Sequence, residues 1–83
     1  MIVKVSGDSM INAGINDGDL VLVKRSNNFK LGDIVLARSS DGITIKRIII
    51  EKGKYYLKPE NKNYKKIKFS EDTEIIGVVE SRY

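Results

Sequence analysis

Short apolar runs recur along the chain at intervals of roughly 8 to 14 residues, separated by glycine, asparagine and aspartate. This spacing is typical of an all-β protein. No segment keeps the apolar period of a helix for several turns, so we expect no long helix. The pattern predicts strands at Ile2–Val5, Leu20–Lys24, Ile34–Arg38, Ile43–Ile50, Tyr55–Lys58 and Glu74–Glu80.

The segment between the first two predicted strands favours one short helical turn at Ser9–Ala13. Asp8 or Ser9 can cap its start, because their side-chain oxygens accept from backbone N–H groups, and Gly14 can end it. Gly7 permits a sharp turn where the first strand ends. We therefore expect an all-β, mostly β domain with one short helical turn after Gly7.

Two internal features predict how strands pair. G-D-L-V-L-V-K at Gly18–Lys24 is repeated as G-D-I-V-L-A-R at Gly32–Arg38, and each Gly-Asp pair can begin a strand. The similarity of the two copies predicts neighbouring strands in one sheet. The D-G of Asp41–Gly42 fits a tight hairpin that pairs the second copy with Ile43–Ile50. K-P-E-N at Lys58–Asn61 should end the next strand, because proline cannot donate to a central ladder.

Composition narrows the class of protein. The 83 residues, 41% of them hydrophobic, suffice for a single domain covering 1–83. The chain has no cysteine for disulfides, no apolar run that could span a bilayer and no signal-peptide pattern. We expect a cytoplasmic protein with no membrane partner, no metal and no cofactor. Histidine is also absent, so the Ser-His and Cys-His nucleophile pairs are excluded and any general base must be Lys, Asp or Glu.

I-T-I-K-R-I-I-I contains the most informative pair of cations. Because side chains alternate along a strand, Lys46 and Arg47 lie on opposite faces, each among isoleucines. Arginine stays charged, whereas a desolvated lysine can lose its proton. Two interpretations of Lys46 remain open at this point: it extends its ammonium to water, or it is buried and can act as a general base.

V-S-G-D-S-M at Val5–Met10 offers two hydroxyl groups, those of Ser6 and Ser9. A serine at the start of a helical turn is either a cap or a nucleophile. A nucleophile here would sit beside backbone N–H groups that face a developing oxyanion. In a chain without histidine, a neutral lysine is the most economical base for it.

The ordered motifs S-G-D-S-M, G-I-N-D-G-D-L-V-L-V, G-D-I-V-L-A-R, T-I-K-R-I, K-P-E-N and I-I-G-V-V resemble the C-terminal domain of LexA-type repressors and UmuD proteins. These are self-cleaving serine-lysine peptidases of the LexA and signal peptidase superfamily. The resemblance covers nearly the whole chain and implies a small twisted-sheet fold. It implies Ser9 as nucleophile, Lys46 as general base, and the backbone N–H groups of Ser9 and Met10 as the oxyanion hole. Ser6 matches a neighbouring motif position.

The resemblance also implies a biological setting. Such domains act in autoproteolysis of a repressor or SOS-response protein, with a peptide segment of their own longer chain or of a homologue as substrate. A homodimer formed partly by the C-terminal segment Glu74–Tyr83 and a RecA-type filament are the implied partners. A strand ending in an exposed edge would suit the dimer.

One departure from the family concerns the substrate. The family cuts a small-residue bond, typically Ala-Gly, upstream of the nucleophile, whereas M-I-V-K-V-S-G-D before Ser9 contains no such bond. This chain also has no room for a DNA-binding domain and holds no upstream cleavage segment. We expect a fragment, a processed form or a stand-alone domain.

Two alternatives to a peptidase remain. One is a catalytically idle dimerisation or partner-binding module. The other is a basic β domain that binds single-stranded nucleic acid, because Lys52–Phe69 holds seven lysines interleaved with Tyr55, Tyr56, Tyr64 and Phe69. The segment has no arginine, and strand alternation would place several of these rings in the core. We therefore do not expect this domain alone to bind nucleic acid.

Overall fold

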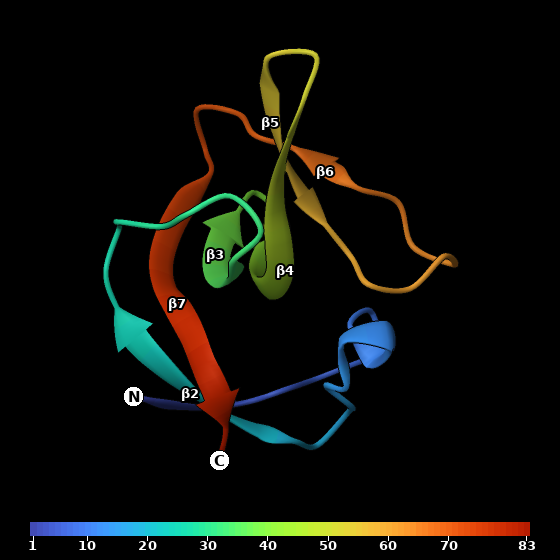
Figure 1. The fold of residues 1–83 in the computed structure, drawn as a ribbon, viewed down its shortest axis with the longest axis vertical. Helices are drawn as coiled ribbons and strands as arrows, with labels where there is room; N and C mark the ends of the chain where they lie inside the picture. The colour runs from blue at the N-terminus through green and yellow to red at the C-terminus, as the bar shows by residue number, and fades with distance from the viewer.

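Seven strands form one antiparallel sheet in the computed structural model, which describes residues 1–83 (Figure 1). The strands are β1 (Ile2–Lys4), β2 (Leu20–Arg25), β3 (Ile34–Ser39), β4 (Gly42–Glu51), β5 (Lys54–Lys58), β6 (Ile67–Lys68) and β7 (Glu74–Arg82). The prediction of an all-β fold is confirmed. All the predicted strands are present; β6, which has two residues, is too short for its pattern to stand out in the sequence.

The strand order is β1-β2-β7-β3-β4-β5-β6, so the C-terminal strand lies inside the sheet. The prediction that the two repeated strands are neighbours is wrong, because β7 separates β2 from β3. β2 pairs with the second half of β7 (Arg25 opposite Gly77) and β3 with its first half (Val35 opposite Val78). Since β3 begins near the level at which β2 ends, the connecting loop needs only to cross β7.

Gly77 lies where β7 passes beside β2. A Cβ atom at this position would stand 2.6 Å from the backbone oxygen of Lys24 and 2.6 Å from Cγ1 of Val23. No side chain other than hydrogen fits without moving the β2 backbone. Beyond Val78, β7 pairs with β2 alone, so its last residues, Val79 to Arg82, have one unpaired side.

Two local features predicted from the sequence, a hairpin and the end of a strand, are present in the structure. The β3–β4 hairpin is confirmed: Ser39 pairs with Gly42, which begins β4 at a φ of 112°. Glycine adopts this positive φ without the steric cost that other residues incur. β5 ends at Lys58, directly before Pro59, as predicted.

The helical turn is shorter than predicted. It is a 3-10 helix, η1, at Ile11–Ala13, and it ends at Gly14 with a φ of 79°. The predicted side-chain cap is wrong, since Met10 is the N-cap residue and no side-chain hydrogen bond caps the turn. Asp8 contributes its backbone carbonyl instead, which accepts from the N–H of Ile11 at 3.3 Å. The hydroxyl of Ser9 is therefore not used as a cap.

The core consists of two groups of buried side chains. The first contains Val5, Met10, Ile15, Val21, Val23, Leu36 and Ile45. The second contains Val35, Ala37, Ile48 and Leu57. The first group joins the segment around η1 to the middle of the sheet, because Met10, only 2% exposed, packs in the same cluster as residues of β3 and β4. No helix in the structure is long and apolar enough to cross a membrane.

Candidate active site

The Ser9 turn, which we define as Gly7–Met10, is fixed at both ends. At its start, Gly7 has a φ of 90° and donates its N–H to Oδ1 of Asp17 at 2.7 Å. At its end, the side chain of Met10 is buried in the core. Ser9 lies between these anchors and is therefore held in one place, while Gly7 and Asp8 before it are exposed.

Lys46 is buried, which excludes the interpretation that its ammonium extends to water. It is 7% exposed, and its Nζ lies 2.9 Å from Oγ of Ser9. Nζ also contacts Oγ1 of Thr44 and lies 3.2 Å from the carbonyl oxygen of Ile45. The structure thus brings together the two residues proposed as base and nucleophile, which are far apart in the sequence.

The electrostatic setting of Lys46 favours loss of its proton. Burial lowers the pKa of the Lys46 ammonium from its ordinary value, because the charged form is separated from water. No carboxylate forms an ion pair with Lys46, so no opposite charge offsets this effect.

Both protonation states of Lys46 can satisfy their hydrogen bonds. As an ammonium, Nζ has three donors for the oxygen atoms of Ser9, Thr44 and Ile45. As a neutral amine, it has two donors and one lone pair, and the lone pair can accept the Ser9 hydroxyl hydrogen. A proton can therefore pass between Ser9 and Lys46 without leaving a buried polar atom unpartnered.

The backbone N–H groups of Ser9 and Met10 donate to no backbone carbonyl of the protein. Both belong to the Ser9 turn, on the N-terminal side of η1. They are thus available as donors to another group beside the Ser9 hydroxyl. Their proposed role as oxyanion donors remains a prediction.

A small cavity lies next to Ser9. Its volume is about 120 Å³, and its apolar lining comes from Val3, Val5, Met10, Leu36, Ile43 and Ile45. Ser6 also lines the cavity, but its hydroxyl makes no hydrogen bond with Lys46. The cavity can accept a small apolar side chain close to the Ser9 hydroxyl.

Two parts of the site were missed in the sequence. Thr44 contacts Nζ of Lys46, and strand alternation could have found it, because the two residues stand two positions apart on one face of β4. The second part is the loop between β5 and β6, which lies beside η1 in Figure 1 and which we define as Pro59–Tyr64. K-P-E-N, at the junction of β5 and this loop, predicted the end of a strand. Glu60 and Asn61 of the motif also contact the Ser9 turn or the residues soon after it.

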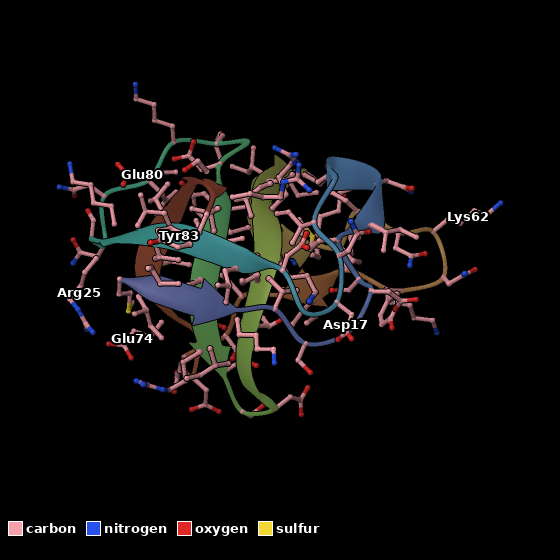
Figure 2. The ribbon with its side chains drawn as sticks, turned by 90° about the horizontal axis from the view of Figure 1, so that it is seen from below. Asp17, Arg25, Lys62, Glu74, Glu80 and Tyr83 are labelled. Carbon is pink, nitrogen blue, oxygen red and sulfur yellow. The ribbon has the colours of Figure 1, made fainter.

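The lysine-rich segment uses its aromatic rings within the protein. The hydroxyl of Tyr64 donates to the carboxylate of Asp8, and the ring of Tyr56 lies 4.6 Å from Nζ of Lys66. Tyr55 packs edge-on against Phe29, with 6.2 Å between ring centroids. Several lysines of the segment are exposed, and Figure 2 shows one of them, at position 62, extending away from the body of the molecule. Each of these three tyrosines thus already has a partner within the protein, although Tyr55 and Tyr64 remain 43% and 45% exposed.

Comparison with known proteins shows which family the sequence is similar to. The model of the family described as Peptidase S24-like matches residues 1–80. A LexA repressor of Clostridium perfringens (strain SM101) is 51% identical over 76 residues, which are 92% of this chain and 37% of the relative. For a LexA repressor of Clostridium acetobutylicum the identity is 44% over 82 residues, or 99% and 40% of the two chains.

A LexA repressor of Alcanivorax borkumensis is also similar, with 44% identity over 75 residues, which are 90% of this chain and 37% of the relative. The chain thus spans about two fifths of the length of the curated relatives it matches. The match to the family model covers almost every residue that forms the sheet and all of the residues around Ser9 and Lys46. The chain belongs to the Peptidase S24-like family.

Proposed function

We propose that this domain is a peptidase with a serine-lysine dyad. Ser9 Oγ attacks the carbonyl carbon of a peptide bond while neutral Lys46 takes the hydroxyl proton. The resulting ammonium gives that proton to the leaving amine as the C–N bond breaks, and water then hydrolyses the acyl-enzyme. The observation that carries this proposal is the 2.9 Å separation of Lys46 Nζ and Ser9 Oγ, which is within reach for proton transfer.

The surroundings of the dyad support the same chemistry. The lowered pKa of Lys46 increases the neutral fraction of the amine at any given pH. The N–H groups of Ser9 and Met10 can donate to the oxyanion that forms at the attacked carbonyl. Because only the neutral amine can act as base, cleavage should become faster as the pH rises.

The substrate we propose is a peptide segment with a small-residue bond such as Ala-Gly, in a longer form of this chain or in a homologue. The apolar cavity of about 120 Å³ beside Ser9 suits a small side chain next to the bond that is cut. The similar proteins are named LexA repressors. We therefore place the activity in autoproteolysis during transcription regulation and the SOS response, with a RecA-type filament as a further partner.

A cleavage assay with paired variants tests the dyad. The protein is mixed with a peptide bearing an Ala-Gly bond or with a longer homologue whose own nucleophile is replaced. Ser9→Ala and Lys46→Ala should each reduce the cleavage rate by about 100-fold or more. Ser81→Ala and Lys24→Ala make the same chemical changes on β7 and β2, away from the site, and should cleave like the unchanged protein. Equal rates for the Ser9 and Ser81 variants would refute the dyad.

A partner-binding module remains the second candidate, because one surface suits self-association. The end of β7 has one unpaired side. Leu20, on the paired strand β2, and Ile2, on β1 beyond it, are exposed apolar residues. Tyr83, 76% exposed, lies across β2 in the view of Figure 2. A homodimer formed partly by Glu74–Tyr83 would cover this surface.

Sedimentation velocity tests the homodimer. If the protein self-associates through this surface, Leu20→Asp should weaken the dimer, whereas Leu31→Asp, at an equally apolar and exposed position outside it, should not. A dimer together with no cleavage under any condition would favour the idle module over the peptidase. A monomer at all concentrations would count against self-association.

A further inference from the structure

Asn61 is a buried polar residue that the dyad chemistry does not use. It lies in the Pro59–Tyr64 loop and is 6% exposed. Its side-chain Nδ2 donates to the carbonyl oxygen of Asp8 at 2.9 Å, and its Oδ1 accepts from the N–H of Asn63 at 3.0 Å. One end of the amide group is thus fixed by its own loop, and the other end holds the Ser9 turn.

The Asp8 carbonyl accepts from Nδ2 of Asn61 at 2.9 Å and, over a longer distance of 3.3 Å, from the N–H of Ile11. The shorter bond, from Asn61, helps to set the direction of a second group. The carbonyl of Asp8 belongs to the same planar peptide unit as the N–H of Ser9, and in a trans peptide these two groups point in opposite directions. When Asn61 holds the Asp8 oxygen toward the loop, the Ser9 N–H must point away from the loop. That N–H donates to no backbone carbonyl, so its direction is not set by a bond of its own.

Glu60 ties the same loop to η1 and to β4. Its backbone carbonyl accepts from the N–H of Asn12 at 2.9 Å, and its backbone N–H lies 3.3 Å from the sulfur of Met10. Its carboxylate pairs with Nε of Arg47 at 2.5 Å. Because Arg47 follows Lys46 in β4, the loop that orients the Ser9 turn is fixed to the strand that carries the lysine.

We propose that Asn61 is a positioning residue, whose side-chain amide orients the Asp8–Ser9 peptide so that the Ser9 N–H faces the substrate oxyanion. The proposal rests on the proposed peptidase function. Asn61 touches none of the reacting atoms and acts only through the Asp8 carbonyl. Without the Asn61 donor, the Asp8 carbonyl keeps only the longer bond from the Ile11 N–H at 3.3 Å. The peptide unit is then held less firmly, and the Ser9 N–H is no longer fixed for the charge that develops during attack.

The test compares Asn61→Asp with Asn63→Asp. Both variants add one negative charge to the same loop, but only the first replaces the donor that faces the Asp8 carbonyl. With an Ala-Gly peptide as substrate, Asn61→Asp should lower kcat by about 10- to 100-fold and leave KM within a few-fold, because the oxyanion forms only during reaction. The pH midpoint of the rate should match that of Asn63→Asp, since Lys46 keeps its surroundings.

A second measurement reports the orientation of the Asp8–Ser9 peptide and does not depend on cleavage. In amide NMR spectra of the folded proteins, Asn61→Ala should shift the Ser9 N–H signal strongly, while Asn63→Ala should not. An Asn61→Asp enzyme that is less stable yet has the kcat of Asn63→Asp overturns the positioning role, as does an unmoved Ser9 signal. If the unchanged protein cleaves nothing, the peptidase proposal fails instead, and the NMR comparison still decides whether Asn61 sets this peptide.

Discussion

The two faces of β4 hold their cations in opposite ways. On one face, Lys46 is 7% exposed and has only neutral oxygen atoms as partners. On the other, Arg47 pairs with the carboxylate of Glu60 and donates to the carbonyl of Gly32. Arginine keeps its charge under almost all conditions and needs a counter-charge when partly buried, whereas lysine can give up its charge. The difference indicates that Lys46 can be charged or neutral, depending on pH, whereas Arg47 stays charged. We call the first a conditional charge and the second a permanent charge.

Both side chains nevertheless connect β4 to the same segment of the chain, the Ser9 turn. Lys46 reaches the Ser9 hydroxyl directly, and Arg47 reaches the Ser9 turn through Glu60 and its loop. Under the proposed function, neighbouring residues of one strand would contribute a group for proton transfer and a support for the backbone around it. The predictions below test this division, from the largest expected effect to the smallest.

Exchanging the two cation types should separate their roles most clearly. Lys46→Arg keeps a positive charge but cannot supply a neutral base, so cleavage of an Ala-Gly peptide should fall by about 10²- to 10⁴-fold. Arg47→Lys keeps a cation beside Glu60 and should cost less than about 10-fold. The measurement is kcat/KM over a range of pH. A Lys46→Arg variant with an unchanged rate and pH profile would show that Lys46 is not the base.

Removing the permanent charge should mainly affect stability. Arg47→Met leaves the Glu60 carboxylate without its partner, and we expect the free energy of unfolding to fall by about 1–3 kcal/mol. The control is Arg38→Met, because the Arg38–Glu74 pair has side chains that are 56% and 63% exposed. That variant should lose less than about 1 kcal/mol. Urea unfolding measures both, and equal losses would contradict a special role for the Arg47 pair.

Removing the conditional charge of Lys46 should raise the free energy of unfolding rather than lower it. Because burial lowers the folded-state pKa of Lys46, the unfolded chain takes up the proton first as the pH falls below about 10.4. This destabilises the fold increasingly until the pH is below the folded pKa, where the effect levels off. Lys46→Met should therefore raise stability at pH 7 by about 1 kcal/mol, and the gain should disappear at high pH.

Urea unfolding of the Lys46→Met variant at neutral and alkaline pH checks this sign. Lys24→Met replaces an exposed lysine of β2 and serves as the reference for the loss of one positive charge. A clear loss of stability at pH 7, relative to that reference, would mean that the fold favours the charged form of Lys46.

Thr44→Val should have the smallest effect and tests whether Thr44 influences the protonation of Lys46. Valine has nearly the same shape but removes an acceptor of the ammonium, so the pKa of Lys46 should fall further. The pH midpoint of cleavage should move to lower pH, with a change in stability below about 1 kcal/mol. Thr73→Val, in the turn before β7, should leave the midpoint in place. A midpoint that does not move would mean that Thr44 contributes nothing to the protonation of Lys46.

Local features of the fold could be read from the sequence, whereas the strand order could not. Alternation and turn residues indicated each of the longer strands and the hairpin before Gly42, because both signals depend only on neighbouring residues. The two Gly-Asp strands look alike because each begins after a turn, and this says nothing about which strand lies beside them. Whether β7 enters between them depends on how a loop crosses the sheet and on the space at Gly77.

The candidate site shows the same limit. Ser9 and Lys46 could be proposed from the sequence because serine and lysine suit a nucleophile and a base in a chain without histidine, and because the resemblance to a known family selected Ser9 over Ser6. Thr44 could have been added from strand alternation. Asn61 could not, because it acts on a backbone carbonyl, and the direction of a peptide unit leaves no pattern in residue types.

The place of β7 in the sheet has a consequence for the timing of synthesis. β1 and β2 lie on one side of it and β3 to β6 on the other, so the ladders of the two parts connect only through residues 74–82. On the ribosome, Ser9 and Lys46 emerge well before this strand does. The nascent chain therefore carries both residues of the proposed dyad before it has the sheet that aligns them, and a chain that stops short of β7 would keep these two residues without a complete scaffold.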